Sequence, residues 1–213
     1  MKFINLHTHR FSNNEEIFEV VNQYPWEFDE KIPQYSIGIH PWYIDKARLS
    51  EDLNTIVDKL KETNCLALGE CGLDKRIEIP FHVQREVFQQ QIEIVQQTTK
   101  PIILHCVAAY QEVIGIKNEM NIENSMIIHG FSKNTQVAKS LLDNGFYLSF
   151  GKYLLRNPEL EKVFNFVPND LFFLETDTIE ETIDEVYKKA ATYKQMNLEE
   201  VKQQVQKNFN KAF

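Results

Sequence analysis

Two histidines separated by one residue follow an apolar stretch near the start of the chain, in the sequence INLHTHR. In an extended strand the side chains of residues i and i+2 point to the same side, so we expect His7 and His9 to present two imidazoles to one point. Imidazoles are ligands for zinc, manganese and iron-type ions. A His-x-His pattern also arises by chance, and a lone histidine at a strand end is more often a hydrogen-bonded structural group. The pair alone is therefore only a hypothesis of metal binding.

Other groups with metal-binding chemistry occur at similar places along the chain. Apolar, β-branched and aromatic runs typical of strands buried on both faces occupy 3–7, 35–40, 65–70, 101–106, 125–130, 146–151 and 171–177. At or beside the ends of these runs stand His7, His9, His40, Glu70, His105, His129 and Asp177. The carboxyl ends of parallel strands meet at one edge, so we expect these side chains to converge.

Helical patterns separate the expected strands, at 15–23, 50–63, 81–98, 110–120, 134–144, 158–165, 178–194 and 198–212. Asn157-Pro158, Thr178-x-x-Glu181 and Asn197 have the residue types of helix N-termini. Alternating strands and helices indicate an α/β protein with a parallel sheet, in one domain over residues 1–213. Strand order alone leaves an open sheet and a closed barrel as alternatives. About seven strands fall short of a regular eight-stranded barrel, so a barrel would be incomplete or distorted.

The composition excludes several classes of protein. The 213 residues are 43% hydrophobic and 25% charged, which is typical of a folded globular chain. A formal net charge of −8 argues against a surface that binds nucleic acid all over. No run is long enough to span a membrane and no signal-peptide pattern is present, so we expect a cytoplasmic protein. Cys65, Cys71 and Cys106 are expected to be small buried hydrophobes.

The predicted ligand set is too large for one tetrahedral ion. A purely structural role would leave several buried charges without partners, at several kcal/mol for each. The six predicted ligands are His7, His9, Glu70, His105, His129 and Asp177. They are more than one such ion needs, which favours a two-metal site with a bridging carboxylate. Glu70 is the natural bridge. The mixed nitrogen and oxygen ligands suit several ions, so magnesium, manganese and zinc all stay open.

The sequence resembles the TatD-like metal-dependent hydrolases, a branch of the amidohydrolase-type barrels. The motifs that carry the resemblance are NLHTHR, GIHPW, LGECGLD, PIILHC, IIHGF and LETD, with NFNKAF similar to the family's closing Asn-x-x-x-x-Phe helix. The resemblance implies a TIM-like (β/α) barrel with outer helices. It also implies two metal ions, one held by His7, His9, Glu70 and Asp177 and the other by Glu70, His105 and His129.

The resemblance also gives expectations for two residues that are not predicted ligands. His40 lies in the family's G-x-H-P motif, where it is expected to touch substrate phosphate or to support the metal site. The alternative is that His40 only shapes the turn before Pro41. Glu175 has a supporting or structural role and is not predicted to be a ligand. His82, in the first turn of a helix, is expected to be exposed.

These residues predict a metal-dependent hydrolase. Divalent ions lower the pKa of a bound water to about 7 and stabilise developing negative charge, which phosphodiester hydrolysis requires. Asp177 can accept or pass on the proton of that water, so Asp177 and Glu70 are the predicted catalytic residues. The resemblance implies a DNase, most simply a 3′-to-5′ exonuclease. The expected substrate is a small anionic molecule or a DNA or RNA end, with no membrane and no obligate protein partner.

A set of basic residues follows the expected strand ends and could collect phosphate. The set is Arg10, Lys75, Arg76, Lys133, Lys152 and Arg156, and we predict substrate binding by Lys152 and Arg156. The alternative is ordinary solvated loop charge.

The chain departs from the family pattern at three places near the predicted site. Val107 replaces a basic residue, Trp42 replaces a second histidine, and no proline follows Asp177. These departures leave two other functions open. One is hydrolysis of an amide, lactone or aminoacyl ester on the same scaffold, and the other is a catalytically silent binding protein.

Overall fold

The structure is a computed structural model that describes residues 1–213. The chain forms two compact units. We call Met1–Val21 with Ile127–Ala212 the terminal unit, and Asn22–Met126 with Phe213 the central unit. The prediction of one domain over 1–213 stays a prediction.

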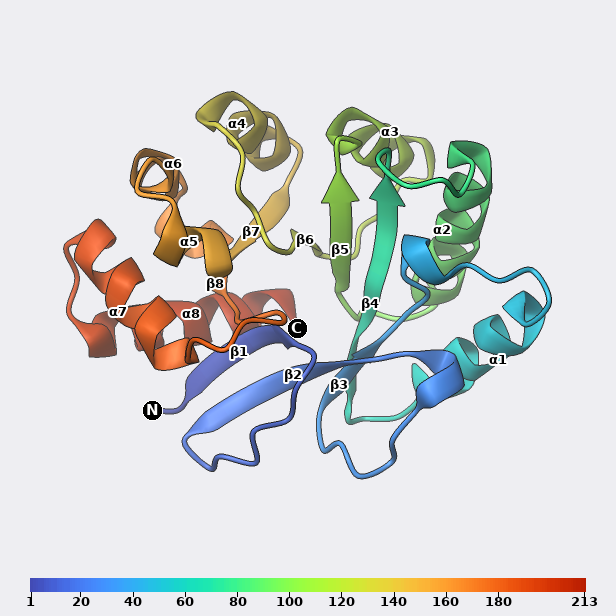
Figure 1. Ribbon diagram of the computed structural model, residues 1–213, viewed down its shortest axis with the longest axis horizontal. Coiled ribbons are helices and arrows are strands. Elements are labelled where there is room, and N and C mark those ends of the chain that lie inside the picture. Colours follow the sequence, from blue (N-terminus) through green and yellow to red (C-terminus); the bar gives the residue numbers. More distant parts are fainter. The chain divides into compact units, whose positions relative to one another are not determined.

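Eight strands occur in the chain order β1 to β8 within one sheet, and β1 with β2, β3 with β4, β4 with β5 and β7 with β8 pair in parallel. Their bounds are β1 Phe3–Thr8, β2 Ile17–Gln23, β3 Tyr35–Ile37, β4 Cys65–Asp74, β5 Ile102–Val107, β6 Met126–Ile128, β7 Phe146–Phe150 and β8 Phe172–Leu174. Helices follow most of the strands (Figure 1). The order is that of a TIM-like (β/α) fold, so the predicted class is confirmed.

The strand count corrects one prediction, because the chain has eight strands rather than about seven. The missing strand is β2, where the sequence pattern predicted a helix over 15–23. Ile17, Phe18, Val20 and Val21 are spaced so that they also fit the apolar stripe of a helix. Consecutive residues from Glu19 to Gln23 are buried, which an amphipathic surface helix would not allow.

The helices are α1 Leu49–Lys59, α2 Phe81–Val95, α3 Tyr110–Glu119, α4 Thr135–Asp143, α5 Lys152–Arg156, α6 Leu160–Phe166, α7 Ile183–Lys194 and α8 Leu198–Ala212, with short 3-10 helices η1 Pro25–Glu27, η2 Pro41–Tyr43 and η3 Asn169–Leu171. The predicted capping box at Thr178 is wrong, because the capping box that begins α7 pairs Thr182 with Glu185. The predicted cap at Asn197 is confirmed, since its Oδ1 accepts from the Glu200 amide at 2.9 Å.

In the terminal unit, hydrogen bonds join β1 to the segment that follows β8. The Asn5 amide group donates to the Thr176 hydroxyl at 2.8 Å, and the Thr176 backbone amide donates to Asn5 Oδ1 at 2.9 Å. The Tyr187 hydroxyl of α7 donates to the Ile4 carbonyl at 2.9 Å. Asn208 of α8 donates to the Phe172 carbonyl at 2.8 Å. The C-terminal helices therefore fix the two strands whose ends carry His7, His9 and Asp177.

In the central unit, α2 packs on β4, and β4 has a change of register against β5 between Leu68 and Cys71. Such a bulge re-aims a side chain, and Glu70 lies within it. Gly72 has φ +139°, and a Cβ there would lie 2.1 Å from the His105 carbonyl oxygen. Only glycine allows this approach of β4 to β5, so the sequence GECG serves the position of Glu70.

The three cysteines are buried and free of disulfides, as predicted. Burial raises the pKa of the Cys65 and Cys106 thiols to about 12. His82 is exposed on α2, also as predicted. No helix of the chain has the length and apolar character that a membrane span requires.

Candidate metal centre

Three predicted ligands of the terminal unit lie together where β1, β6 and β8 end. Ligand atoms of His7, His129 and Asp177 are all within 4.8 Å of one another. His9 joins them, because its Nε2 lies 3.5 Å from Asp177 Oδ1, while His7 Nε2 lies 3.9 Å from the same oxygen. The His7 and His9 rings are 5.1 Å apart and nearly perpendicular. The period-two geometry of β1 thus brings both imidazoles to one carboxylate, as expected.

Backbone contacts hold Asp177 opposite the two histidines. The Asp177 amide donates to the His7 carbonyl at 2.9 Å, and the His9 amide donates to the Asp177 carbonyl at 3.1 Å. Asp177 itself has φ +54°, a left-handed conformation that aspartate tolerates better than most residues. The chain therefore turns out of β8 at the residue whose carboxylate faces the imidazoles.

Glu175 supports His129 from inside the terminal unit. Its Oε1 accepts from the Gly130 amide at 2.8 Å and lies 3.3 Å from His129 Nδ1. Burial by itself raises the pKa of Glu175, but the hydrogen bond and charge of His129, with the charge of His7, hold that pKa below its usual range. A histidine whose Nδ1–H is held by a carboxylate presents Nε2 for metal binding. The position of Glu175 agrees with a supporting role.

The central unit contains a second cluster, built around Glu70. Ligand atoms of His40, Glu70 and His105 are within 4.8 Å of one another. Glu70 Oε1 lies 2.9 Å from His105 Nδ1 and 3.1 Å from His40 Nε2. The Glu70 backbone amide donates to Asn22 Oδ1 at 2.6 Å, which fixes the strand at the bulge. Glu70 is only 3% exposed, so a buried carboxylate stands between two imidazoles.

The hydrogen bonds of His40 determine which of its ring nitrogens carries the proton. His40 Nδ1 accepts from the backbone amide of Trp42 at 3.1 Å. Neutral imidazole has one N–H, so the proton is on Nε2, where it donates to Glu70. A ring with Nδ1 accepting and Nε2–H donating offers no lone pair to a metal ion. In this arrangement His40 is held to Glu70 rather than open to an ion, and its predicted contact with substrate stays a prediction.

Asp74 was not among the predicted site residues. It ends β4, is 2% exposed, and its Oδ2 lies 3.2 Å from His105 Nε2 and accepts from the Trp42 indole N–H at 2.8 Å. Burial raises the pKa of Asp74, but hydrogen bonds from Trp42, the Arg76 amide and His105 outweigh burial and lower it. With Nε2 engaged by Asp74, His105 directs Nδ1 to Glu70. The sequence pattern missed Asp74 because the predicted strand run ended at residue 70, whereas β4 continues to Asp74.

Replacement of Asp74 by asparagine tests this supporting role. The amide keeps the shape but no longer provides the negative charge that orients the His105 ring, so we expect metal affinity to fall by about 10- to 100-fold. Isothermal titration with Mn²⁺ and Zn²⁺ measures the change. Asp58→Asn, at an exposed position of α1, is the matched control and should leave affinity unchanged. Equal affinities in Asp74→Asn and the wild type would contradict the role.

The donor sets of both clusters fit divalent ions. The terminal unit offers the imidazole nitrogens of His7, His9 and His129 with the Asp177 carboxylate, and the central unit offers His105 with the Glu70 carboxylate. In each unit a further buried carboxylate holds one histidine. Nitrogen and oxygen donors of this kind suit first-row divalent metals and magnesium. The predicted ligands are thus brought into two groups, one in each unit.

The predicted substrate-binding residues Lys152 and Arg156 line one hollow of about 500 Å³ in the terminal unit, with Thr178 and Glu181. The Arg156 guanidinium forms a two-pronged ion pair with Glu181, with nitrogen to oxygen distances of 2.6 and 2.8 Å. Its charge is therefore largely neutralised by Glu181. Lys75, another member of the basic set, forms an ion pair with Glu112.

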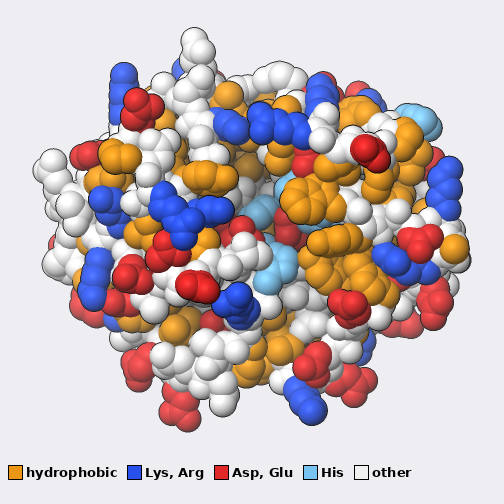
Figure 2. Space-filling model, viewed as in Figure 1, with side chains coloured by type: hydrophobic (Ala, Val, Ile, Leu, Met, Phe, Trp, Pro, Cys, Tyr) orange, Lys and Arg blue, Asp and Glu red, His pale blue; other side chains and the backbone are white.

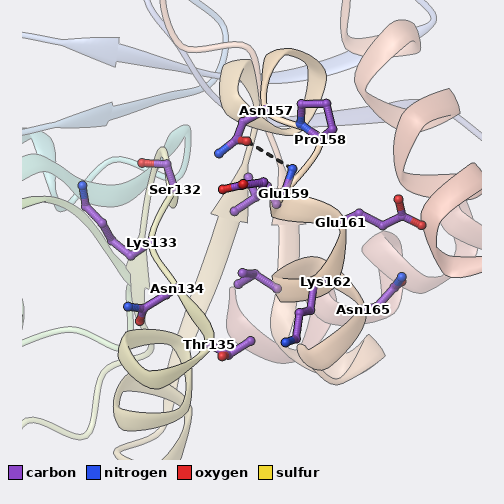
Figure 3. A pocket seen from close by; sticks show the side chains of 12 residues that line it. Ser132, Lys133, Asn134, Thr135, Asn157, Pro158, Glu159, Glu161, Lys162 and Asn165 are labelled. Atoms are coloured by element: carbon purple, nitrogen blue, oxygen red, sulfur yellow. Dashed lines mark hydrogen bonds between the residues drawn. The ribbon is translucent and has the colours of Figure 1, made fainter.

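A larger hollow of about 740 Å³ lies between the N-terminal ends of α4 and α6 (Figure 3). In Figure 3 the Asn157 side chain turns back on its own loop, where Oδ1 accepts from the Glu159 amide at 3.1 Å. The charged residues that line this hollow are Lys133, Lys162, Glu159 and Glu161, so the lining has no net charge. No predicted metal ligand lines this hollow.

Comparisons with known proteins agree on one family. A family model described as "TatD related DNase" matches residues 2–213. "Uncharacterized metal-dependent hydrolase YabD" of Bacillus subtilis is 35% identical over 147 residues, covering 67% of this chain and 57% of the relative. "Uncharacterized metal-dependent hydrolase YcfH" of Escherichia coli K12 is 34% identical over 148 residues, covering 68% and 55%. The chain thus spans a little over half the length of these curated relatives.

A solved structure gives the same result for the fold. The crystal structure of YJJV, a TatD homologue from Escherichia coli, matches with a TM-score of 0.84 at 19% identity, covering 99% of this chain and 97% of the other. At this identity the likeness establishes the fold, which is TIM-like.

Proposed function

The chain belongs to the family of TatD-related DNases, and we propose that it is a divalent-metal-dependent hydrolase that cleaves phosphodiester bonds at nucleic-acid ends. One observation carries this proposal. Each of two clusters gathers imidazoles and a carboxylate, and each has a buried carboxylate that orients a histidine. Carboxylates that hold the second ring nitrogen of a histidine are common behind metal ligands, and this supports the proposal.

We assign the ligands as the family resemblance implies. His7, His9, Glu70 and Asp177 would hold one ion, and Glu70, His105 and His129 would hold the second, with Glu70 shared. The two ions, of magnesium, manganese or zinc, would lower the pKa of a bound water and stabilise negative charge on the phosphate oxygens.

The chain's own residues supply the proton transfer and the alignment. Asp177, which is partly exposed, is placed to accept the proton of the attacking water and to pass it to solvent. His40 holds Glu70 through Nε2–H, and Asp74 and Glu175 hold His105 and His129. Lys152 is the better candidate for binding substrate phosphate, because Arg156 is already paired with Glu181.

The test is hydrolysis by the purified protein loaded with Mg²⁺, Mn²⁺ or Zn²⁺. We expect a 5′-labelled single-stranded DNA to be shortened stepwise from its 3′ end, and treatment with a chelator to stop the reaction. A chromogenic phosphodiester and a panel of esters and lactones run in parallel. Turnover of an ester or lactone without DNA cleavage would support the non-nucleic alternative. Absence of all turnover in metal-loaded protein would refute the hydrolase proposal.

A further inference from the structure

Two consecutive aromatic residues next to the central cluster are open to solvent. Trp42 is 51% exposed and Tyr43 is 44% exposed, and both lie on η2 directly after His40. Their rings lie 5.0 Å and 5.5 Å from the His40 ring. We call Trp42 and Tyr43 the aromatic shelf. In Figure 2 hydrophobic side chains reach the surface in the half of the view that holds α1, α2 and β3–β5.

The first ring of the shelf, that of Trp42, is held in place by a hydrogen bond rather than by burial. The Trp42 indole N–H donates to the buried carboxylate of Asp74 at 2.8 Å. The Trp42 ring meets His40 and His105 edge to face, at 5.0 Å and 5.6 Å between ring centroids. The indole is therefore held against two residues of the metal cluster while half of its surface stays in water.

The second ring is held by a different group of neighbours. Tyr43 packs edge to face against Tyr24 at 5.4 Å and against Trp26 at 6.0 Å. Arg48 donates to the Tyr43 carbonyl at 2.6 Å, and its guanidinium lies 4.0 Å from the centre of the Trp26 ring. Both rings of the shelf are thus ordered before any ligand arrives.

The surroundings of the shelf favour a flat, neutral partner over a phosphate. Behind Tyr43 lies a hollow of about 660 Å³ whose charged residues are Glu27, Asp45, Lys46 and Arg48, with no net charge. Arg48 is paired with Asp45 at 3.3 Å and with Asp52 at 2.9 Å. Burial of a large apolar ring stabilises a protein, so a ligand that covers Trp42 and Tyr43 would gain this free energy. A pre-ordered aromatic face without net charge is suited to stacking, which every nucleobase can provide.

We propose that the aromatic shelf stacks an unpaired nucleobase of a single-stranded nucleic acid, next to the phosphodiester bond that is cleaved. The inference rests on the proposed function and specifies its substrate as single-stranded. In this arrangement the base lies on the exposed rings of Trp42 and Tyr43.

Binding can be followed without hydrolysis. The chain has two tryptophans, so Trp26→Phe leaves Trp42 as the only one. In chelator-treated protein, titration with an oligothymidylate should quench Trp42 fluorescence to saturation. An oligomer of the same length with abasic residues should bind about 10-fold or more weakly, because stacking on aromatic residues contributes that much per base. Equal quenching by both oligomers, or no quenching by either, would overturn the inference.

Variants of the shelf give a second readout, in metal-loaded protein. Tyr43→Ala and Trp42→Ala should each raise KM for single-stranded DNA by about 10-fold, and each should raise KM for the abasic oligomer by clearly less. Trp42→Phe keeps a ring but cannot hydrogen-bond to Asp74, so its KM should rise less than that of Trp42→Ala. Phe166→Ala, at an equally exposed aromatic of α6, is the control. Unchanged KM in both alanine variants would overturn the inference.

The outcomes separate the two proposals. Base-dependent quenching in a protein that cleaves no nucleic acid would refute the proposed function and keep the stacking site. Cleavage of DNA without base-dependent quenching would keep the proposed function and refute the stacking site.

Discussion

Replacing Asp177 by asparagine is expected to lower kcat for hydrolysis of single-stranded DNA by about 10³-fold, within the range for loss of a general base. Asparagine keeps the size of the side chain but accepts no proton at neutral pH. It also provides a weaker ligand oxygen beside His7 and His9, whose Nε2 atoms lie 3.9 and 3.5 Å from Asp177 Oδ1. The measurement is kcat and KM with saturating Mn²⁺. Under this condition the variant and the wild type are compared at the same metal occupancy, even if the variant binds metal more weakly.

The matched control is Asp143→Asn, at an exposed position of α4 where the carboxylate pairs with Lys139. Its kcat should equal that of the wild type. An Asp177→Asn protein that is folded, metal-saturated and within about threefold of wild-type kcat would remove Asp177 from the proton transfer, since a general base contributes far more than that.

Replacing Glu70 by glutamine is expected to have an equally large effect, and for two reasons. The proposed shared carboxylate would lose its charge, so the chain should bind at most one ion where the wild type binds about two. The amide oxygen of glutamine could still accept from His40 Nε2–H, but the negative charge that lies 2.9 Å from His105 Nδ1 would be gone. Metal content and kcat are measured together, and we expect kcat to fall by about 10³-fold.

Glu119→Gln on α3 controls for the loss of a carboxylate. Glu119 is exposed and forms an ion pair with Arg85. Its metal content should match the wild type. A Glu70→Gln protein that keeps both ions and wild-type kcat would show that Glu70 is not shared, and the two-metal assignment would then be withdrawn.

Much of the fold follows from local sequence signals. The positions of His7, His9 and Asp177 could be predicted from two simple rules. Side chains two residues apart in a strand point to the same side, and the carboxyl ends of parallel strands lie at one edge. The strand β2 could not be placed, because apolar residues at i, i+1, i+3 and i+4 fit both a buried strand and a helix face. Only pairing with β1, through Phe3 to Ile17 and Ile4 to Phe18, distinguishes the two.

The supporting contacts of the site were harder to predict than the ligands. Asp74 accepts from Trp42, 32 positions away in sequence, and holds His105, 31 positions away, and no spacing rule connects these residues. The bulge that aims Glu70 depends on close approach of two strands at Gly72 and His105. Arg156 was predicted to bind substrate from its place in a loop, but its ion pair with Glu181 across 25 positions is visible only in three dimensions.

The metal content of the purified protein tests the central claim most directly. Protein prepared without chelator and reloaded with Mn²⁺ or Zn²⁺ should carry about two ions per chain. A His7→Ala/Asp177→Ala double variant that remains folded, by its circular dichroism spectrum, should carry at most one. A wild-type chain that holds no stoichiometric divalent ion, or a double variant with the same content as the wild type, would contradict the account.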